Sequence, residues 1–144
     1  LSEIDPDHSE IYTQNAQAYI NQCQELDKWF TNESKQFRVH HFVSAHSAWV
    51  YLARDYNLVQ VGVIEETPGE EPSPKKIQSL VENLKISEIP VVFAEPQLSQ
   101  KTAQILVEEV GVKVTVLDPL GRFPDIPFLE TMKNNLNKIV EVMK

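Results

Sequence analysis

Apolar residues recur at steps of three and four along the first part of the chain. One such stripe consists of Tyr12, Ala16, Tyr19, Cys23, Leu26 and Phe30. This spacing marks one face of a helix. Asp5 precedes the stripe and can cap free N–H groups, while Pro6 suits the first helical position. The pattern predicts a long helix that ends near Asn32 and occupies most of residues 1–34.

After this helix the pattern changes to short apolar runs that alternate with further helical stretches. The runs typical of strands cover residues 37–44, 58–64, 89–94 and 113–117. The helical stretches cover residues 44–56, 73–84, 99–110 and 128–143. Regular alternation of this kind predicts βαβ units and a parallel sheet, and continuous apolar strands indicate that both sheet faces are covered. We therefore expect an α/β fold, with a four-stranded parallel sheet and helices on both faces.

Individual residues sharpen the expected helix boundaries and buried faces. Ser73 is expected to cap a helix whose first position is Pro74, and Gly111 fits the position just after a helix end. In the helix over residues 44–56, the expected inward face carries Ala48, Leu52 and Tyr56. In the last helix, the expected inward residues are Phe128, Met132, Leu136, Ile139 and Met143.

Composition excludes several classes of protein. The 144 residues carry a net charge of −8, which argues against a nucleic-acid partner, because phosphate binding needs a basic patch. Four glycines, none of them clustered, leave no loop that could cradle a phosphate, and no G-x-S-x-G motif is present. Cys23 is the single cysteine, so no disulfide can form within the chain. No run is apolar enough to span a bilayer.

Polar residues follow each predicted strand, at the rim where ligands bind in open α/β sheets. His46 follows the first strand, Glu65 and Glu66 the second, Glu95 the third and Asp118 the fourth. Histidine and carboxylates are ligands for zinc or a similar divalent cation. This rim is therefore the predicted place for a metal site.

Each of these residues also has a purely structural interpretation. A single histidine such as His46 is more often a surface or core residue than a ligand. Glu65 and Glu66 belong to an acidic segment with Glu70 and Glu71, which favours a solvated turn. Glu95 and Asp118 both precede a proline, a common feature of loops and turns. His40 and His41 lie in a strand pattern and point to opposite faces, so we interpret them as structural.

Several segments resemble a known family. The stretch VSAHSAWVYLARDYNL (residues 43–58) resembles the third metal-ligand segment of the zinc- and manganese-binding solute-binding proteins of ABC transporters. FAEPQ (residues 93–97) and LDPLG (residues 117–121) resemble signatures of the zinc-type branch. The opening stretch is similar to the long helix that joins the two lobes of those proteins. The whole chain thus resembles their C-terminal lobe, with a linker helix over residues 1–34 and the lobe over residues 35–144.

The resemblance implies a function and a site. The expected protein captures zinc as its cargo, delivers it to an ABC permease and catalyses no reaction. It is periplasmic or otherwise extracytoplasmic, with or without a lipid anchor. His46 matches the metal-binding histidine of the lobe, and Asp118 matches an aspartate that closes or approaches the site. The other two histidine ligands are expected in an N-terminal lobe that this sequence does not contain.

Two alternatives stay open beside zinc capture. A manganese- or iron-carrying relative is the first, although the manganese branch usually has glutamate where this chain has His46, and nitrogen ligation favours zinc. The second is a flavodoxin-like enzyme or signalling domain, but a phosphoacceptor domain would have paired acidic residues after the first strand.

For His46 we expect one ring nitrogen on the metal and the other held by a carbonyl or a carboxylate.

Overall fold

The computed structural model describes residues 1–65, 72–86, 88–96, 100–121 and 125–144. The chain divides into two compact units, Leu1–Lys35 and Gln36–Lys144. The first unit contains a short 3-10 helix, η1 (Pro6–His8), and the long helix α1 (Ser9–Ser34). Among the residues described, no helix combines the length and apolar character needed to cross a membrane.

The predicted long helix is present, but its start is built differently from the expectation. Pro6 occupies the first turn, as predicted, whereas the Asp5 side chain caps no backbone N–H group. Its carboxylate instead accepts a hydrogen bond from the Tyr12 hydroxyl at 2.7 Å and lies 2.9 Å from Nδ1 of His8. These two interactions lower the pKa of Asp5, because both favour its charged form. Along the stripe, Tyr12 and Cys23 are half-buried, whereas Ala16 is exposed.

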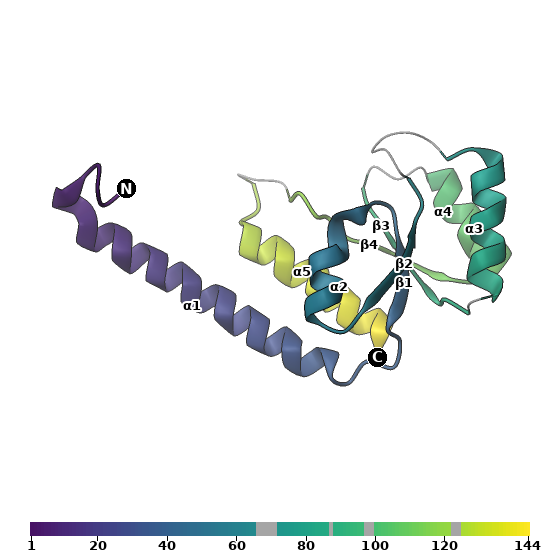
Figure 1. The fold of residues 1–144 in the computed structure, drawn as a ribbon, viewed down its shortest axis with the longest axis horizontal. Helices are drawn as coiled ribbons and strands as arrows, with labels where there is room; N and C mark the ends of the chain where they lie inside the picture. The colour runs from purple at the N-terminus through teal and green to yellow at the C-terminus, as the bar shows by residue number, and fades with distance from the viewer. Residues whose placement is uncertain (66–71, 87, 97–99, 122–124) are drawn as a thin grey trace. The chain divides into compact units, whose positions relative to one another are not determined.

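The second unit is a four-stranded parallel sheet covered by helices. The strands are β1 (His41–Ser44), β2 (Val59–Val63), β3 (Val91–Ala94) and β4 (Lys113–Val116), in the order β2-β1-β3-β4. The helices are η2 (Ser47–Trp49), α2 (Val50–Asp55), α3 (Pro74–Ile86), α4 (Gln100–Val110) and α5 (Phe128–Met143). Figure 1 shows α3 and α4 on one face of the sheet and α2 and α5 on the other. The predicted fold class is confirmed.

Strand pairing continues just past the strand ends and aligns them at one rim. The Ala45 amide donates to the carbonyl of Phe93 at 2.7 Å, and the Ile64 amide donates to the carbonyl of Ser44 at 2.9 Å. On the far side of β3, the Leu117 amide donates to the carbonyl of Ala94 at 2.9 Å. Residues that follow different strands are therefore neighbours in space, which is the arrangement that the parallel pattern predicted.

Apolar packing fixes the sheet from within. Phe42 on β1 and Phe93 on β3 are fully buried, and their ring centroids lie 4.8 Å apart. A contiguous core of buried residues joins the sheet to α3 and α4. It consists of Val43, Ala45, Ile64, Leu80, Leu84, Ile89, Val92, Ala94, Leu106 and Val112. Burial of apolar surface on this scale is the main stabilising contribution to such a domain.

Helix ends in the second unit follow the predicted signals. The Ser73 hydroxyl accepts a hydrogen bond from the Lys76 amide at 3.3 Å, and Pro74 is the first residue of α3. Gly111 adopts a φ of 74° directly after α4, and its amide donates to the carbonyl of Val107 at 2.9 Å. Both predictions are confirmed. The predicted start of α4 at residue 99 lies outside the described residues.

Several finer predictions were wrong. The first strand begins at His41, four residues later than expected, and Ser44 belongs to that strand and not to the following helix. In the η2–α2 segment, Trp49 and Ala53 are buried, whereas Ala48 is exposed, because the segment opens with a 3-10 turn that rotates the inward face. Phe128 is 55% exposed at the first turn of α5.

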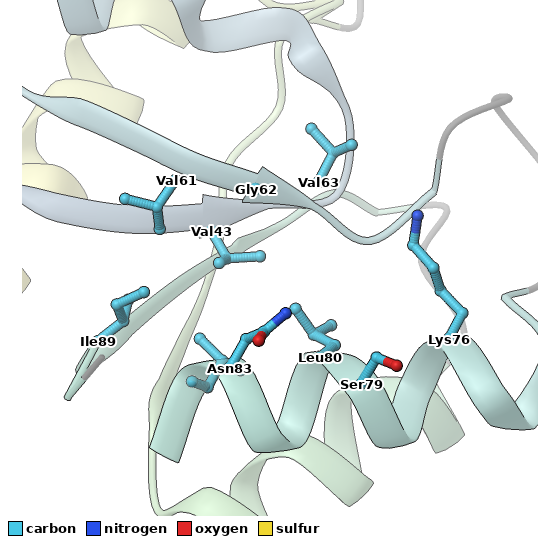
Figure 2. Close-up of a pocket in the computed structure, with 10 residues that line it drawn as sticks. Val43, Val61, Gly62, Val63, Lys76, Ser79, Leu80, Asn83 and Ile89 are labelled. Carbon is cyan, nitrogen blue, oxygen red and sulfur yellow. The ribbon is translucent and has the colours of Figure 1, made fainter. Parts of the chain in front are cut away.

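A hollow of about 490 Å³ lies between β2 and α3. Figure 2 shows Val43 on β1 pointing towards Leu80 and Asn83 on α3. The hollow lies at β2, which forms the edge of the sheet. Its lining is mainly apolar, and its polar residues include Lys76 and Ser79 on α3. None of the residues predicted to hold a metal lines this hollow.

Candidate metal-binding site

His46 lies immediately beyond the end of β1, in extended backbone that leads into η2. Its main-chain carbonyl is anchored, because the Ser44 hydroxyl donates to it at 2.6 Å. The side-chain amide of Gln60, on β2, donates in turn to that hydroxyl at 2.8 Å. The strand end, and not the short helix that follows, therefore determines where the imidazole points.

The imidazole of His46 lies between two carboxylates from the neighbouring strand ends. Nε2 is 2.9 Å from Oε2 of Glu65, which follows β2, and Nδ1 is 3.1 Å from Oε2 of Glu95, which follows β3. The three side chains are 14%, 5% and 6% exposed, respectively. The strand order places β1 between β2 and β3, so a residue after β1 receives one neighbour from each side.

The contact with Glu65 involves the ring nitrogen at the far end of the imidazole. A carboxylate oxygen only accepts, so this 2.9 Å contact is a hydrogen bond when Nε2 carries the ring hydrogen. A metal needs a nitrogen lone pair, so a metal that binds through Nε2 displaces that hydrogen.

Glu95 supplies a further indication that the site suits a cation. Its Oε2 faces the imidazole, whereas its Oε1 is buried and has no hydrogen-bond partner within the described part of the chain. A buried carboxylate oxygen without a partner is energetically costly. A cation, or water bound to a cation, would satisfy this oxygen. The donor set of one imidazole nitrogen and carboxylate oxygens therefore fits a divalent metal as cargo.

Asp118 also lies at the rim, but its carboxylate serves the backbone. Oδ1 accepts hydrogen bonds from the amides of Leu120, at 3.1 Å, and Gly121, at 2.9 Å. Its own main chain is held by Asn135 on α5, whose side-chain oxygen accepts from the Asp118 amide and whose side-chain nitrogen donates to the Asp118 carbonyl. The structure thus shows the turn role that an aspartate before proline suggested, and a metal role for Asp118 stays a prediction.

Within the second unit, His40 and His41 lie apart from this rim cluster. Nδ1 of His40 is 2.9 Å from the carbonyl oxygen of Asn57, and His41 is exposed at the start of β1. His8 contacts Asp5 in the first unit. Across the ranges that the structure describes, no group of three or more His, Cys, Asp or Glu residues is arranged to hold a metal ion by itself.

The family described as "Zinc-uptake complex component A periplasmic" matches residues 1–142. The chain belongs to this zinc-uptake family. Its members are solute-binding transport proteins, so the match agrees with the resemblance of the sequence segments.

Individual relatives of the zinc-uptake family are similar over most of this chain. It is 40% identical over 120 residues to the zinc-binding lipoprotein AdcA of Streptococcus pneumoniae, covering 83% of this chain and 24% of that protein. It is 32% identical to the high-affinity zinc uptake system protein ZnuA of Bacillus subtilis, covering 94% of this chain and 44% of that protein. The chain therefore spans less than half the length of these curated relatives.

A solved structure gives the same result for the fold. The Zn(II)-bound ZnuA-like domain of Streptococcus pneumoniae AdcA superposes on 99% of this chain with a TM-score of 0.83 and 34% identity. The match covers 55% of that domain. The chain thus shares the fold of a zinc-bound member of the zinc-uptake family.

Sequence reasoning placed His46 at the strand-end rim of this family member but misjudged two neighbouring residues. Glu65 was interpreted as part of a solvated acidic turn, yet it is 6% exposed and contacts His46. Glu95 was interpreted as a loop anchor, yet it contacts the other ring nitrogen. The signal that could have identified both residues is position, because Glu95 follows β3 directly and Glu65 lies two residues after β2. Glu66, Glu70 and Glu71 lie outside the described residues.

Proposed function

We propose that this chain is the C-terminal lobe of a solute-binding protein that captures zinc outside the cytoplasm and passes it to an ABC permease. His46 is the ligand that this lobe contributes. The proposal is carried by the placement of the His46 imidazole at the strand-end rim between two buried carboxylates. It is supported by the family match over residues 1–142 and by the zinc-binding names of the relatives.

In this proposal the metal site is shared between two lobes. A protein zinc site uses three or four ligands, and the described part of this chain has no group of three. An N-terminal lobe would supply the missing histidines, and residues 1–34 would form the helix that links the lobes. The bound ion would hold the lobes together, and the permease would recognise the resulting shape. No reaction is catalysed.

The compartment follows from the same reasoning. Relatives are named as a lipoprotein in Streptococcus pneumoniae and as an uptake protein in Bacillus subtilis. A protein that feeds a permease must meet its cargo on the outer side of the membrane. We therefore place this protein in the periplasm or an equivalent extracytoplasmic space.

The deciding experiment replaces His46 with alanine in the full-length protein. Loss of a ligand leaves the cation under-coordinated, so zinc affinity should fall by more than about 100-fold. This exceeds the roughly 10- to 100-fold loss that follows when a residue hydrogen-bonded to a ligand is removed. Asp118→Ala should cost less, because water can replace its carboxylate. Zinc affinities are measured by competition with a chelator. Unchanged affinity in His46→Ala would refute the proposal.

Two further measurements sharpen the proposal. Calorimetric titration of the 144-residue chain alone should show only weak zinc binding, because the other lobe's ligands are missing. Competition between zinc and manganese in the full-length protein tests the manganese alternative, which the two carboxylates around His46 keep open, since oxygen ligands suit harder cations. We expect zinc to win, because imidazole nitrogen prefers it.

A further inference from the structure

The contact between His46 and Glu65 brings two potential metal ligands close together. Nε2 and Oε2 are 2.9 Å apart, a hydrogen-bond distance. In tetrahedral zinc sites the metal lies about 2.0–2.2 Å from nitrogen and oxygen ligands, which puts two such ligands about 3.3–3.6 Å from each other. The two atoms therefore need to separate by only a few tenths of an ångström to admit a cation. The hydrogen between them would leave as the metal enters.

From this geometry we propose that Glu65 is a metal ligand of this lobe, binding the same ion as Nε2 of His46. The inference rests on the proposed function and adds to it a second ligand from this lobe. Through its contact with Nε2, Glu65 also holds the imidazole in its binding orientation. In the metal-bound protein its carboxylate shares the charge of the ion.

Glu95 has a different role from Glu65, because it faces the other ring nitrogen of His46. Nδ1 is bonded to Cγ, the ring atom that carries Cβ, so a metal bound at Nδ1 would sit close to the main chain, whereas Nε2 is at the far end of the ring. Glu95 also follows β3, which is flanked by strands on both sides, while Glu65 follows the edge strand β2. Glu95 thus orients the ring through Nδ1, and Glu65 lies on the side that the metal enters.

Glu95 adds buried negative charge next to the proposed metal position. Its Oε1 has no hydrogen-bond partner within the described residues, and the Glu95 side chain is only 6% exposed. The cluster therefore buries more acceptor capacity than the imidazole can satisfy. A divalent ion on the Nε2 side would offset the negative charge of both carboxylates, which lie on either side of the same ring.

The test compares three glutamate variants of the full-length protein, each loaded with zinc or with cobalt(II). Glu65→Gln keeps the size of the side chain and removes its charge, and Glu65→Ala removes the ligand altogether. Glu95→Gln changes the residue on Nδ1. Glu141→Gln is the matched control, since Glu141 is exposed on α5. Thermal unfolding in the presence of a chelator identifies any variant that fails to fold.

Both Glu65 variants should lose at least about tenfold in zinc affinity, because removing even the partner of a ligand costs 10- to 100-fold. The visible bands of bound cobalt(II) should also change in position and intensity, since they report the ligands directly. The control should match the parent in both measurements. Cobalt bands that stay unchanged in Glu65→Ala, or that change in Glu95→Gln alone, overturn the assignment of Glu65.

The outcome of this test is separate from that of the proposed function. If His46→Ala abolishes zinc binding while the Glu65 variants bind zinc with the affinity and cobalt spectrum of the parent, only the Glu65 inference fails. If His46→Ala binds zinc normally, the proposed function fails as well.

Discussion

The hydroxyl of Ser44 donates a 2.6 Å hydrogen bond to the main-chain carbonyl of His46, two residues further along the chain. This bond closes the backbone at the end of β1 and fixes the direction in which the imidazole leaves the sheet. Gln60 on the neighbouring strand completes the arrangement by donating to the same hydroxyl. Ser44 itself is fully buried.

Replacing Ser44 with alanine should therefore weaken metal binding without removing a ligand. A hydrogen bond of this type contributes a net 0.5–1.5 kcal/mol, so we expect an affinity loss of about 2- to 10-fold for zinc. Chelator competition on the full-length protein measures this loss of zinc affinity. Ser79→Ala, an exposed serine on α3, is the control and should leave affinity unchanged. A loss as large as that of His46→Ala would mean that the hydroxyl does more than hold the backbone.

Asn135 should be a stability residue of the rim. Its side chain is 2% exposed. The side-chain oxygen accepts a hydrogen bond from the Asp118 amide at 3.0 Å, and the side-chain nitrogen donates one to the Asp118 carbonyl at 2.7 Å. Asn135→Ala would leave these two backbone groups without partners, at a cost of about 1–3 kcal/mol in the free energy of unfolding. Urea denaturation tests this expectation. The exposed neighbour Asn134, changed to alanine, should cost far less.

Two glycines with positive φ, Gly111 and Gly121, allow a matched comparison. Gly111 has a φ of 74° and open space where a Cβ would lie, whereas a Cβ on Gly121, at φ 70°, would meet the Thr131 hydroxyl at 3.3 Å. Alanine at Gly111 should cost about 1–2 kcal/mol of unfolding free energy from backbone strain alone. Alanine at Gly121 should cost more, because it adds crowding. Equal losses in thermal or urea unfolding would show that Thr131 moves aside freely.

The fold of this chain was largely predictable, because its signals are local. Apolar runs of strand length, the Ser73–Pro74 helix start and the glycine after α4 each depend on a few neighbouring residues, and all appear in the structure. Predictions of the inward face were weaker where a helix begins irregularly. Ala48 was misplaced because a 3-10 turn precedes α2, and such a turn has no clear signature in apolar spacing.

The site was predictable only in part, because its contacts are not local. Parallel topology placed His46 at the rim beyond the strand ends, where the structure also has it, and the contacts with Glu65 and Glu95 follow from the order of the strands. That order is not encoded in the spacing of any single segment. The cluster of acidic residues around Glu65 also favoured a solvated loop, since charged residues are rarely buried without a partner. The partner, His46, lies 19 residues away in sequence.

The strand order β2-β1-β3-β4 has a consequence for the order of events in folding. The carboxylates on the two sides of His46 meet it only after β1 has paired with both β2 and β3. Pairing of parallel strands brings together distant parts of the chain and is intrinsically slow. The environment of His46 therefore forms late in folding. Zinc should therefore slow the unfolding of the folded full-length protein. It should change the rate of the first collapse of the chain far less.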